Sequence, residues 1–149
     1  MVKNVLNTLR KKQKNNKGFS LVELIVVIAI MAVLVGILAP QFIKYVDKSR
    51  ASTDMQNLQE IKAAVETYFS DTESDSEEAF KLTATAGDTT CTVATGGTAA
   101  LTNAGLSTAP TLKSKKWSAI SMVYNAKTNT WTISGTNSVD TTKYDLSKL

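Results

Sequence analysis

The sequence predicts an α+β fold in which a long N-terminal α-helix packs on a small antiparallel β-sheet head. Three observations support this class: an apolar run over residues 19–39, an amphipathic pattern that continues to about residue 70, and alternating apolar residues within 117–134. The helix is expected to bury one stripe and the sheet one face, so that both share a single core. We expect roughly three or four strands in the head.

Basic residues are distributed unevenly along the chain of 149 residues, whose formal net charge is +4. Of the seventeen Lys and Arg residues, six precede residue 19, where no acid occurs. The other eleven face thirteen acids in residues 19–149. The excess positive charge therefore belongs to the first segment, and we expect no nucleic-acid binding by the rest of the chain.

Residue types that most enzyme sites need are scarce. The chain has no histidine, which removes the commonest general base and the commonest metal ligand. Cys91 is the single cysteine and cannot close a disulfide within the chain. We expect a small buried side chain, with a reactive or intermolecularly paired thiol as the alternative. Asp71, Glu73 and Asp75 are spaced like calcium-loop ligands, but Ser76 occupies the position that requires glycine. We predict no catalytic residue, no metal site and no cofactor.

The apolar run from Phe19 to Ala39 is long enough to cross a membrane. Only Ser20 and Glu23 are strongly polar among its twenty-one residues, and a helix of that length spans ~31 Å against ~30 Å of hydrocarbon. The basic residues before it place the first segment in the cytoplasm and the rest outside. An ionisable residue in such a span costs about 2.5 kcal/mol or more, so Glu23 indicates a partner or a function.

The order of these features is typical of one protein family. A basic segment ends at Gly18, the apolar run starts with Phe19, Glu23 follows four residues later, and Pro40 ends the run. Over roughly residues 10–70 this pattern resembles the type IV pilin family, which includes type II secretion pseudopilins and competence pilins. The resemblance implies that a prepilin peptidase cuts between Gly18 and Phe19 and that N-methyl-Phe19 becomes the first residue. We also predict that Glu23 pairs with the cationic N-terminus of Phe19 in a neighbouring subunit. The alternative is a contact within one chain, since the two residues lie one helical turn apart.

The same resemblance implies four segments in a lollipop-shaped pilin. These are a cleaved basic leader, a hydrophobic transmembrane and filament-core helix, an amphipathic helix and a globular β-rich head, at residues 1–18, 19–40, 41–70 and 71–149. The chain would be a structural subunit of a type IV pilus, held in the cell membrane before assembly and then in an extracellular surface filament. Implied partners are other copies of the chain, the membrane, a prepilin peptidase and N-methyltransferase, an assembly ATPase and a platform protein.

Two alternatives stay open at this level. A major pseudopilin of a type II secretion system would show the same pattern, so the sequence does not separate it from a pilus subunit used in adhesion, motility or DNA uptake. A membrane-anchored binding domain that never polymerises is the alternative from another class. Cleavage and methylation at Phe19 would have no evident use in such an anchor.

The helix is expected to continue past its weakest stretch, between Gly36 and Pro40. Glycine favours the unfolded chain and proline lacks an N–H donor, so these residues predict a kink or a joint at which a filament could extend. Beyond them, apolar residues at three- and four-residue steps predict a buried stripe of Ala51, Met55, Leu58, Ile61, Val65, Tyr68 and Phe69. On the other faces we expect Lys48, Asp54, Gln59, Lys62 and Glu66.

The head is expected to begin with an acidic loop over residues 71–78, whose charges face water or a neighbouring subunit. Residues 89–93 predict a short strand and Gly96 with Gly97 a turn. The segment between the loop and residue 112 shows no other firm pattern.

The clearest strand signal covers residues 117–124. Its alternation predicts Ile120, Met122 and Tyr124 on one face and Trp117 on the other. A polar connection over residues 125–129 and renewed alternation over 130–134 predict a hairpin. In the tail that follows, Tyr144 and Leu146 are expected to cover a sheet edge.

Overall fold

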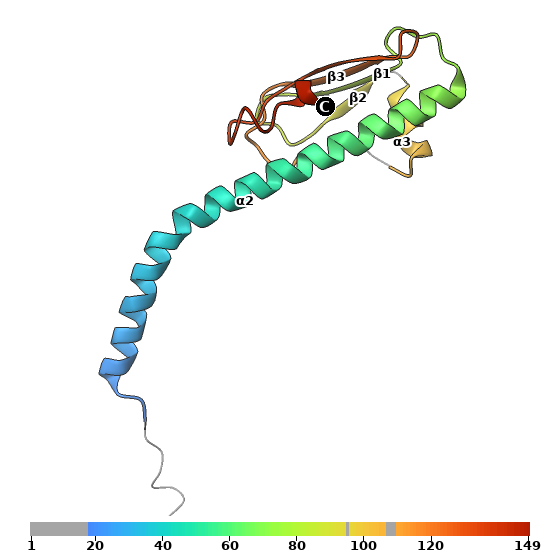
Figure 1. The fold of residues 1–149 in the computed structure, drawn as a ribbon. Helices are drawn as coiled ribbons and strands as arrows, with labels where there is room; N and C mark the ends of the chain where they lie inside the picture. Colours follow the sequence, from blue (N-terminus) through green and yellow to red (C-terminus); the bar gives the residue numbers. More distant parts are fainter. Residues whose placement is uncertain (1–17, 95, 107–109) are drawn as a thin grey trace, which may run out of the picture. The chain divides into compact units, whose positions relative to one another are not determined.

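The structure is a computed structural model that describes residues 18–94, 96–106 and 110–149. Its elements, in chain order, are α2, β1, β2, α3, β3, β4 and the short 3₁₀ helix η2 (Figure 1). The chain divides into two compact units, Met1–Gln41 and Phe42–Leu149. Most of the leader expected over residues 1–18 lies outside the described residues.

The long helix α2 spans Leu21–Thr72, which confirms the helix expected from about residue 20 to about residue 70. It contains Pro40 without interruption of the helical assignment, so the helix does resume beyond the proline. The kink expected at Gly36 and Pro40 stays a prediction. Glu73, with a φ of 46°, follows the helix and turns the chain toward the acidic loop.

The head contains a four-stranded antiparallel sheet in the order β2-β1-β3-β4, which confirms the expected α+β class. The strands are β1 (Phe80–Ala84), β2 (Thr92–Ala94), β3 (Ile120–Asn125) and β4 (Thr130–Ser134). The second half of α2 lies along one face of this sheet (Figure 1). Because strand residues alternate between faces, the face toward the helix carries the buried side chains. They are Phe80, Leu82, Ala84, Ile120, Met122 and Tyr124.

The predicted hairpin is confirmed, because β3 and β4 pair with Asn125 opposite Thr130. The side chain of Asn125 accepts a hydrogen bond from Thr128 N at 3.0 Å. Asn129 has a φ of 52°, a left-handed conformation that asparagine tolerates better than most residues. The connection, expected over residues 125–129, is the four residues 126–129, and it closes through the asparagine chemistry that turns commonly use.

Two expectations for the first part of the head were wrong. The short strand is Thr92–Ala94, while Thr90 forms an isolated bridge with Thr111. The expected glycine turn is the start of a helix, α3 (Gly97–Asn103), with Gly96 at its N-cap in a left-handed conformation. A side chain at Gly97 would overlap that of Val93, so this glycine allows close packing of α3 on the sheet.

Strand β1 had no counterpart in the sequence expectations, and Trp117 was placed wrongly. The strand that was expected from residue 117 starts at Ile120, so the alternation rule does not apply to Trp117. Its side chain is buried, at 2% exposed, and bonds to the long helix. Trp117 is therefore part of the core and does not lie on the outer face of the sheet.

The buried stripe of α2 matches the expectation except at one position. Ala51, Leu58, Ile61, Val65 and Phe69 are buried, and Met55 and Tyr68 are partly buried against the same core. Asp54, which was expected on another face, is fully buried. The three- and four-residue spacing explains this correction, since position 54 lies on the same helical face as positions 51, 58 and 61.

Asp54 is the centre of a buried polar cluster. One carboxylate oxygen accepts a hydrogen bond from Lys113 N at 2.7 Å, and the other accepts from Ser114 N and from Trp117 Nε1, both at 2.9 Å. The hydroxyl of Ser114 in turn accepts from Asn137 Nδ2 at 3.0 Å. A buried carboxylate is tolerated when hydrogen bonds replace its hydration, and this one ties the segment before β3 to α2.

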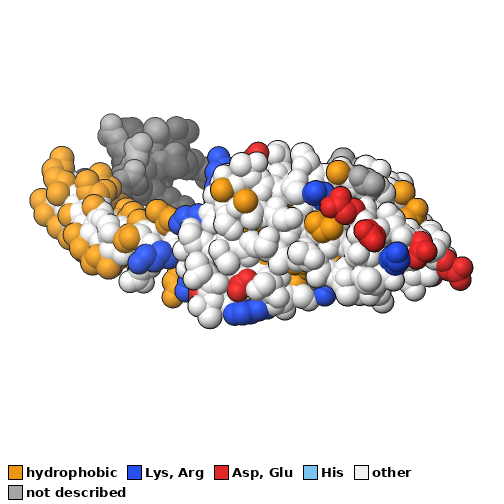
Figure 2. Space-filling model, turned by 90° about the horizontal axis from the view of Figure 1, so that it is seen from above, with side chains coloured by type: hydrophobic (Ala, Val, Ile, Leu, Met, Phe, Trp, Pro, Cys, Tyr) orange, Lys and Arg blue, Asp and Glu red, His pale blue; other side chains and the backbone are white. Residues whose placement is uncertain are grey.

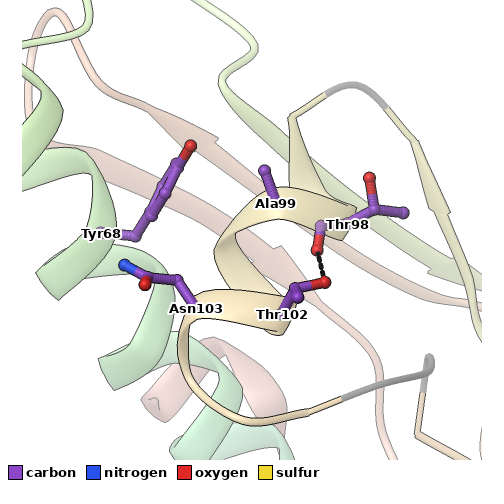
Figure 3. A pocket seen from close by; sticks show the side chains of 5 residues that line it. All are labelled: Tyr68, Thr98, Ala99, Thr102 and Asn103. Atoms are coloured by element: carbon purple, nitrogen blue, oxygen red, sulfur yellow. Dashed lines mark hydrogen bonds between the residues drawn. The ribbon is translucent and has the colours of Figure 1, made fainter.

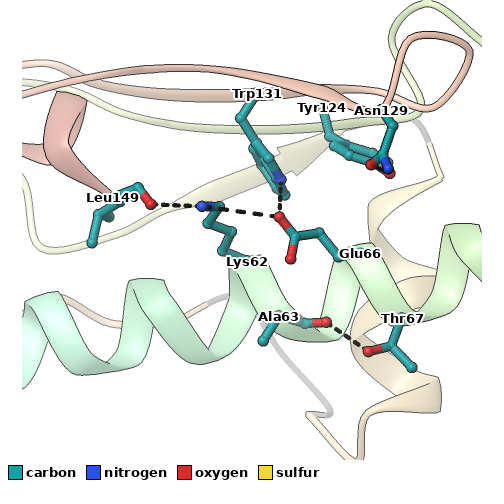
Figure 4. A network of polar contacts seen from close by, with 8 residues as sticks. All are labelled: Lys62, Ala63, Glu66, Thr67, Tyr124, Asn129, Trp131 and Leu149. Atoms are coloured by element: carbon teal, nitrogen blue, oxygen red, sulfur yellow. Dashed lines mark hydrogen bonds and ion pairs between the residues drawn. The ribbon is translucent and has the colours of Figure 1, made fainter.

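Two further side chains that were expected on other faces of the helix bond to the head instead, one to the sheet and one to the tail (Figure 4). Glu66 Oε1 accepts a hydrogen bond from Trp131 Nε1 at 2.8 Å, and Lys62 Nζ donates to the carbonyl of Leu149 at 2.6 Å. Both helix residues are partly buried, so their aliphatic stems cover the margin of the core while their polar ends bond to it.

The tail packs on the long helix as well as on the sheet. Tyr144 and Leu146 are both buried. The 3₁₀ helix η2 (Leu146–Lys148) contacts β4, and Leu146 N donates to Gly135 O at 2.9 Å. The hydroxyl of Tyr144 instead reaches α2, where it donates to Lys48 O and meets Ser52 Oγ, each at 3.1 Å.

Cys91 is buried, as expected for a small core side chain. Desolvation raises the pKa of its thiol to about 11, and the charges of Asp54 and Asp88 act in the same direction. The thiolate is the reactive form, so this cysteine stays protonated and poorly reactive near neutral pH.

We predict that Asp54→Ala lowers the free energy of unfolding by about 3 kcal/mol or more, because it leaves up to three buried N–H donors without an acceptor. The measurement is denaturant unfolding of the detergent-solubilised full chain, followed by tryptophan fluorescence. Glu60→Ala removes one exposed negative charge from the same helix and is expected to change stability by less than about 0.5 kcal/mol. Equal effects of the two changes would contradict a structural role for Asp54.

Candidate functional site

Gly18 and Phe19 lie just before α2 and are exposed. The side chain of Phe19 is 90% exposed, and a side chain added at Gly18 would meet nothing within 4 Å. Neither residue is held by the described part of the chain. If a small residue is required at position 18, the requirement comes from a partner and not from the fold.

Glu23 caps the first turn of α2. Its Oε2 accepts a hydrogen bond from Ser20 N at 2.9 Å, and Ser20 O accepts from Leu24 N at 3.2 Å. The helix starts at Leu21, so Ser20 is the N-cap residue and Glu23 the third helical residue. This is the glutamate half of a capping box, and a carboxylate there is also favoured by the helix dipole.

The sequence expectation for Glu23 missed this bond. It paired the carboxylate with the N-terminus of Phe19 in a neighbouring copy, which one chain does not test. The sequence does contain a signal for this bond, because Ser20 is followed three residues later by Glu23, which is the pattern of a capping box. Removal of residues 1–18 would leave the Ser20 amide in place, so the cap is compatible with processing.

The apolar residues of the first part of α2, from Leu21 onward, are exposed on every face of the helix. Figure 2 shows hydrophobic side chains over the outer surface of this segment. The large ones are all at least 50% exposed and continue past Pro40: Leu21, Val22, Leu24, Ile25, Val26, Val27, Ile28, Ile30, Met31, Val33, Leu34, Val35, Ile37, Leu38, Phe42, Ile43 and Tyr45. Within residues 18–94, 96–106 and 110–149, α2 is the one helix long and apolar enough to cross a membrane, by length and composition.

Gly36 lies inside this exposed segment. A side chain there would meet nothing within 4 Å, so packing in the single chain does not require the glycine. Alanine is favoured over glycine in a helix by about 1 kcal/mol, which makes the glycine a local weakness of α2. Pro40, four residues later, lacks the N–H that would donate to the carbonyl of Gly36, which is the basis of the predicted kink.

The described residues offer little for small-molecule or metal chemistry. No group of three or more His, Cys, Asp or Glu side chains among them is placed to hold a metal ion. A pocket of about 570 Å³ lies between Tyr68 of α2 and Thr98, Ala99, Thr102 and Asn103 (Figure 3). Its lining carries no charged side chain, and Thr102 Oγ1 donates to Thr98 O at 2.7 Å within α3.

The N-terminal segment of the chain matches a model of a known protein family. The family model for the prokaryotic N-terminal methylation motif matches residues 13–39. This range includes Gly18, Phe19 and Glu23, the three residues singled out above as a processing and assembly site. The comparison with solved structures found no significant match.

Three characterised relatives are similar to parts of the chain. A type IV major pilin protein, PilA, from Myxococcus xanthus (strain DK1622) is 39% identical over 56 residues, 38% of this chain and 26% of the relative. Prepilin peptidase-dependent protein A from Clostridium perfringens (strain 13 / Type A) is 37% identical over 78 residues, 52% of this chain and 56% of the relative. A type IV major fimbrial protein, FimA, from Dichelobacter nodosus is 38% identical over 55 residues, 37% of this chain and 35% of the relative. The chain thus spans from about a quarter to just over half of these relatives.

Proposed function

We propose that this chain is a structural subunit of a type IV pilus, because its N-terminal part matches the prokaryotic methylation motif and is similar to type IV major pilins. One observation carries the proposal beyond family membership. The helix from Leu21 onward exposes apolar side chains on all faces, and no other element of the described chain covers them. A helix that is apolar all round is stable in a membrane or among other apolar helices.

The two environments correspond to two stages of one pathway. Before assembly the apolar helix lies in the cell membrane, with the basic leader in the cytoplasm and the head outside. After assembly the helices of many copies cover one another in the core of an extracellular filament. Such an assembly is heterologous and does not close, which allows it to grow.

Processing precedes assembly in this proposal. A prepilin peptidase cuts between Gly18 and Phe19 and methylates the new amino group. Gly18 and Phe19 are exposed and precede the helix, which supports this, because a peptidase needs accessible backbone at the bond it cuts. Extraction from the membrane requires an assembly ATPase and a platform protein as partners.

The names of the relatives favour a pilus over the pseudopilus of a type II secretion system, since two of them are major pilin or fimbrial proteins. The third is named for its dependence on prepilin peptidase, which supports processing at Gly18. A membrane-anchored domain that never polymerises would need the same anchor, but it would not need the methylation motif over residues 13–39.

We propose that Glu23 has a second role in the filament, as partner of the cationic N-terminus of Phe19 in an adjacent copy. In an apolar core a lone carboxylate is costly and a paired one is tolerated. The pair would therefore penalise any stagger of neighbouring helices that leaves Glu23 alone. Its capping bond to Ser20 N uses one carboxylate oxygen and leaves lone pairs on the other for this contact.

The first prediction concerns processing. Mass spectrometry of surface filaments sheared from the source cells should show a chain that starts at N-methyl-Phe19. Gly18→Val should keep the leader and stop filament formation, although the fold has space for the larger side chain. Gly36→Val is the matched control, since it adds the same side chain at another open glycine and should leave cleavage unchanged. An intact leader on wild-type filaments would contradict the proposal.

The second prediction separates the two roles of Glu23. Glu23→Gln keeps an oxygen that can accept from Ser20 N but removes the charge, whereas Glu23→Val removes both. If pairing sets the stagger, both variants should insert and be cleaved but yield at least about tenfold fewer filaments, as loss of one buried charge pair predicts. Glu23→Asp should be intermediate because its reach is one methylene shorter.

Filament yield is measured by shearing and electron microscopy, with membrane levels of the subunit as the control. Normal filaments from Glu23→Gln together with few from Glu23→Val would reduce the role of Glu23 to helix capping. Normal filaments from both variants would show that apolar packing alone sets the stagger.

A further inference from the structure

A basic pocket lies where the segment before β3 meets the tail. It has a volume of about 400 Å³, and Lys115 and Lys116 line it together with the buried Trp117. Hydroxyl-bearing residues complete the lining: Ser118, Thr136, Ser138 and Thr141. Ammonium and hydroxyl groups donate hydrogen bonds to carboxylates, so the chemistry of this pocket fits an acidic ligand.

The two lysines of the pocket differ in whether they already form an ion pair. Lys116 Nζ pairs with Asp47 Oδ2 of α2 at 2.6 Å. Lys115 is exposed and has no ion pair within the described residues, so it retains its charge for a ligand. Because Lys116 pairs with Asp47, the pocket lies beside α2 near residue 47.

The acidic loop is here the segment 71–78, which comprises the last two residues of α2 and the loop after them. It is a ligand of matching charge on the same chain. It carries five acids and no base: Asp71, Glu73, Asp75, Glu77 and Glu78. All five are exposed. Among the described residues, two long ion pairs neutralise part of this negative charge. Lys127 Nζ lies 3.9 Å from Glu77 Oε1, and Lys81 Nζ lies 3.8 Å from Glu78 Oε1. Figure 2 shows acidic side chains gathered toward one end of this face of the molecule.

The pocket and the acidic loop cannot meet within one molecule. Both belong to the compact unit Phe42–Leu149. Along α2, Asp47 and Asp71 are 24 residues apart, which is about 36 Å of helix. The loop of one copy can therefore reach only the pocket of another copy.

We propose that the acidic loop of one subunit docks in the basic pocket of the next. The contact joins opposite ends of two identical units, so each copy keeps one free pocket and one free loop. A head-to-tail contact whose rotation does not close into a ring repeats along an open helical filament, which is the geometry that the proposed function requires. This inference rests on the proposed function and adds a polar contact between heads to the packing of the apolar helices.

Charge reversal tests the contact in the full-length protein in its source cells. Lys115→Glu and Asp75→Lys should each lower the yield of sheared filaments by about tenfold, because each places like charges together. The double variant restores an opposite-charge pair and should recover most of the yield. Lys148→Glu is the matched control: it makes the same charge change at an exposed lysine that neither lines the pocket nor contacts the acidic loop, and its yield should stay near wild type.

Disulfide cross-linking gives a second readout that does not depend on filament yield. Ser138→Cys in the pocket and Asp75→Cys in the loop are co-expressed on separate copies, where the native Cys91 is buried. Dimers on non-reducing gels should form from the mixture and not from either variant alone. Dimers from one variant alone would indicate a two-fold contact and overturn the proposal.

The remaining outcomes also decide between explanations. Wild-type filaments with normal yields from both charge reversals would overturn this inference and leave the proposed function intact. If Lys115→Glu lowers membrane levels of the subunit while Asp75→Lys has no effect, the pocket binds anionic lipid and not the loop. Absence of filaments from the wild type would overturn the proposed function itself.

Discussion

The rest of the structure depends on one constraint: the apolar first part of α2 cannot remain exposed to water. At ~25 cal/mol per Å² of apolar surface, the side chains between Leu21 and Tyr45 represent a large unfavourable exposure. The described chain provides no element to cover them. A membrane satisfies the constraint for one copy, and other copies satisfy it in a filament. The proposed anchoring and assembly would both cover this surface, at successive stages.

The second part of α2, in contrast, is covered by the head and holds it through apolar and polar contacts. Its apolar stripe buries Leu58, Ile61 and Val65 against the sheet, and Asp54 and Glu66 add hydrogen bonds to both tryptophans of the head. Buried polar contacts of this kind specify one arrangement more than they add net stability. These contacts favour a single orientation of the head on the second part of α2.

The sequence allowed most of the architecture to be predicted where a periodic pattern was present. The helix bounds, the β3–β4 hairpin and the buried face through Met122 follow from repeats of 3.6 and 2 residues. Asp54 was misplaced because its charge was weighed above its spacing, and Trp117 because alternation was extended past the strand. Strand β1 and helix α3 lie in short Thr- and Ala-rich segments, where tertiary contacts decide the structure. At the candidate site, Gly18 and Phe19 were found from their order, while the capping bond of Glu23 was overlooked.

The most direct test of this account measures whether the apolar helix is covered at both stages. Ile30→Cys is reacted with a membrane-impermeant maleimide in intact cells and in sheared filaments, with Thr132→Cys on the exposed face of the sheet as the reference. The account predicts that Cys at position 132 is labelled in both preparations. Cys at position 30 should be labelled in neither until detergent or denaturant separates the subunits. Labelling of position 30 in intact filaments would contradict the claim that copies of this helix cover one another.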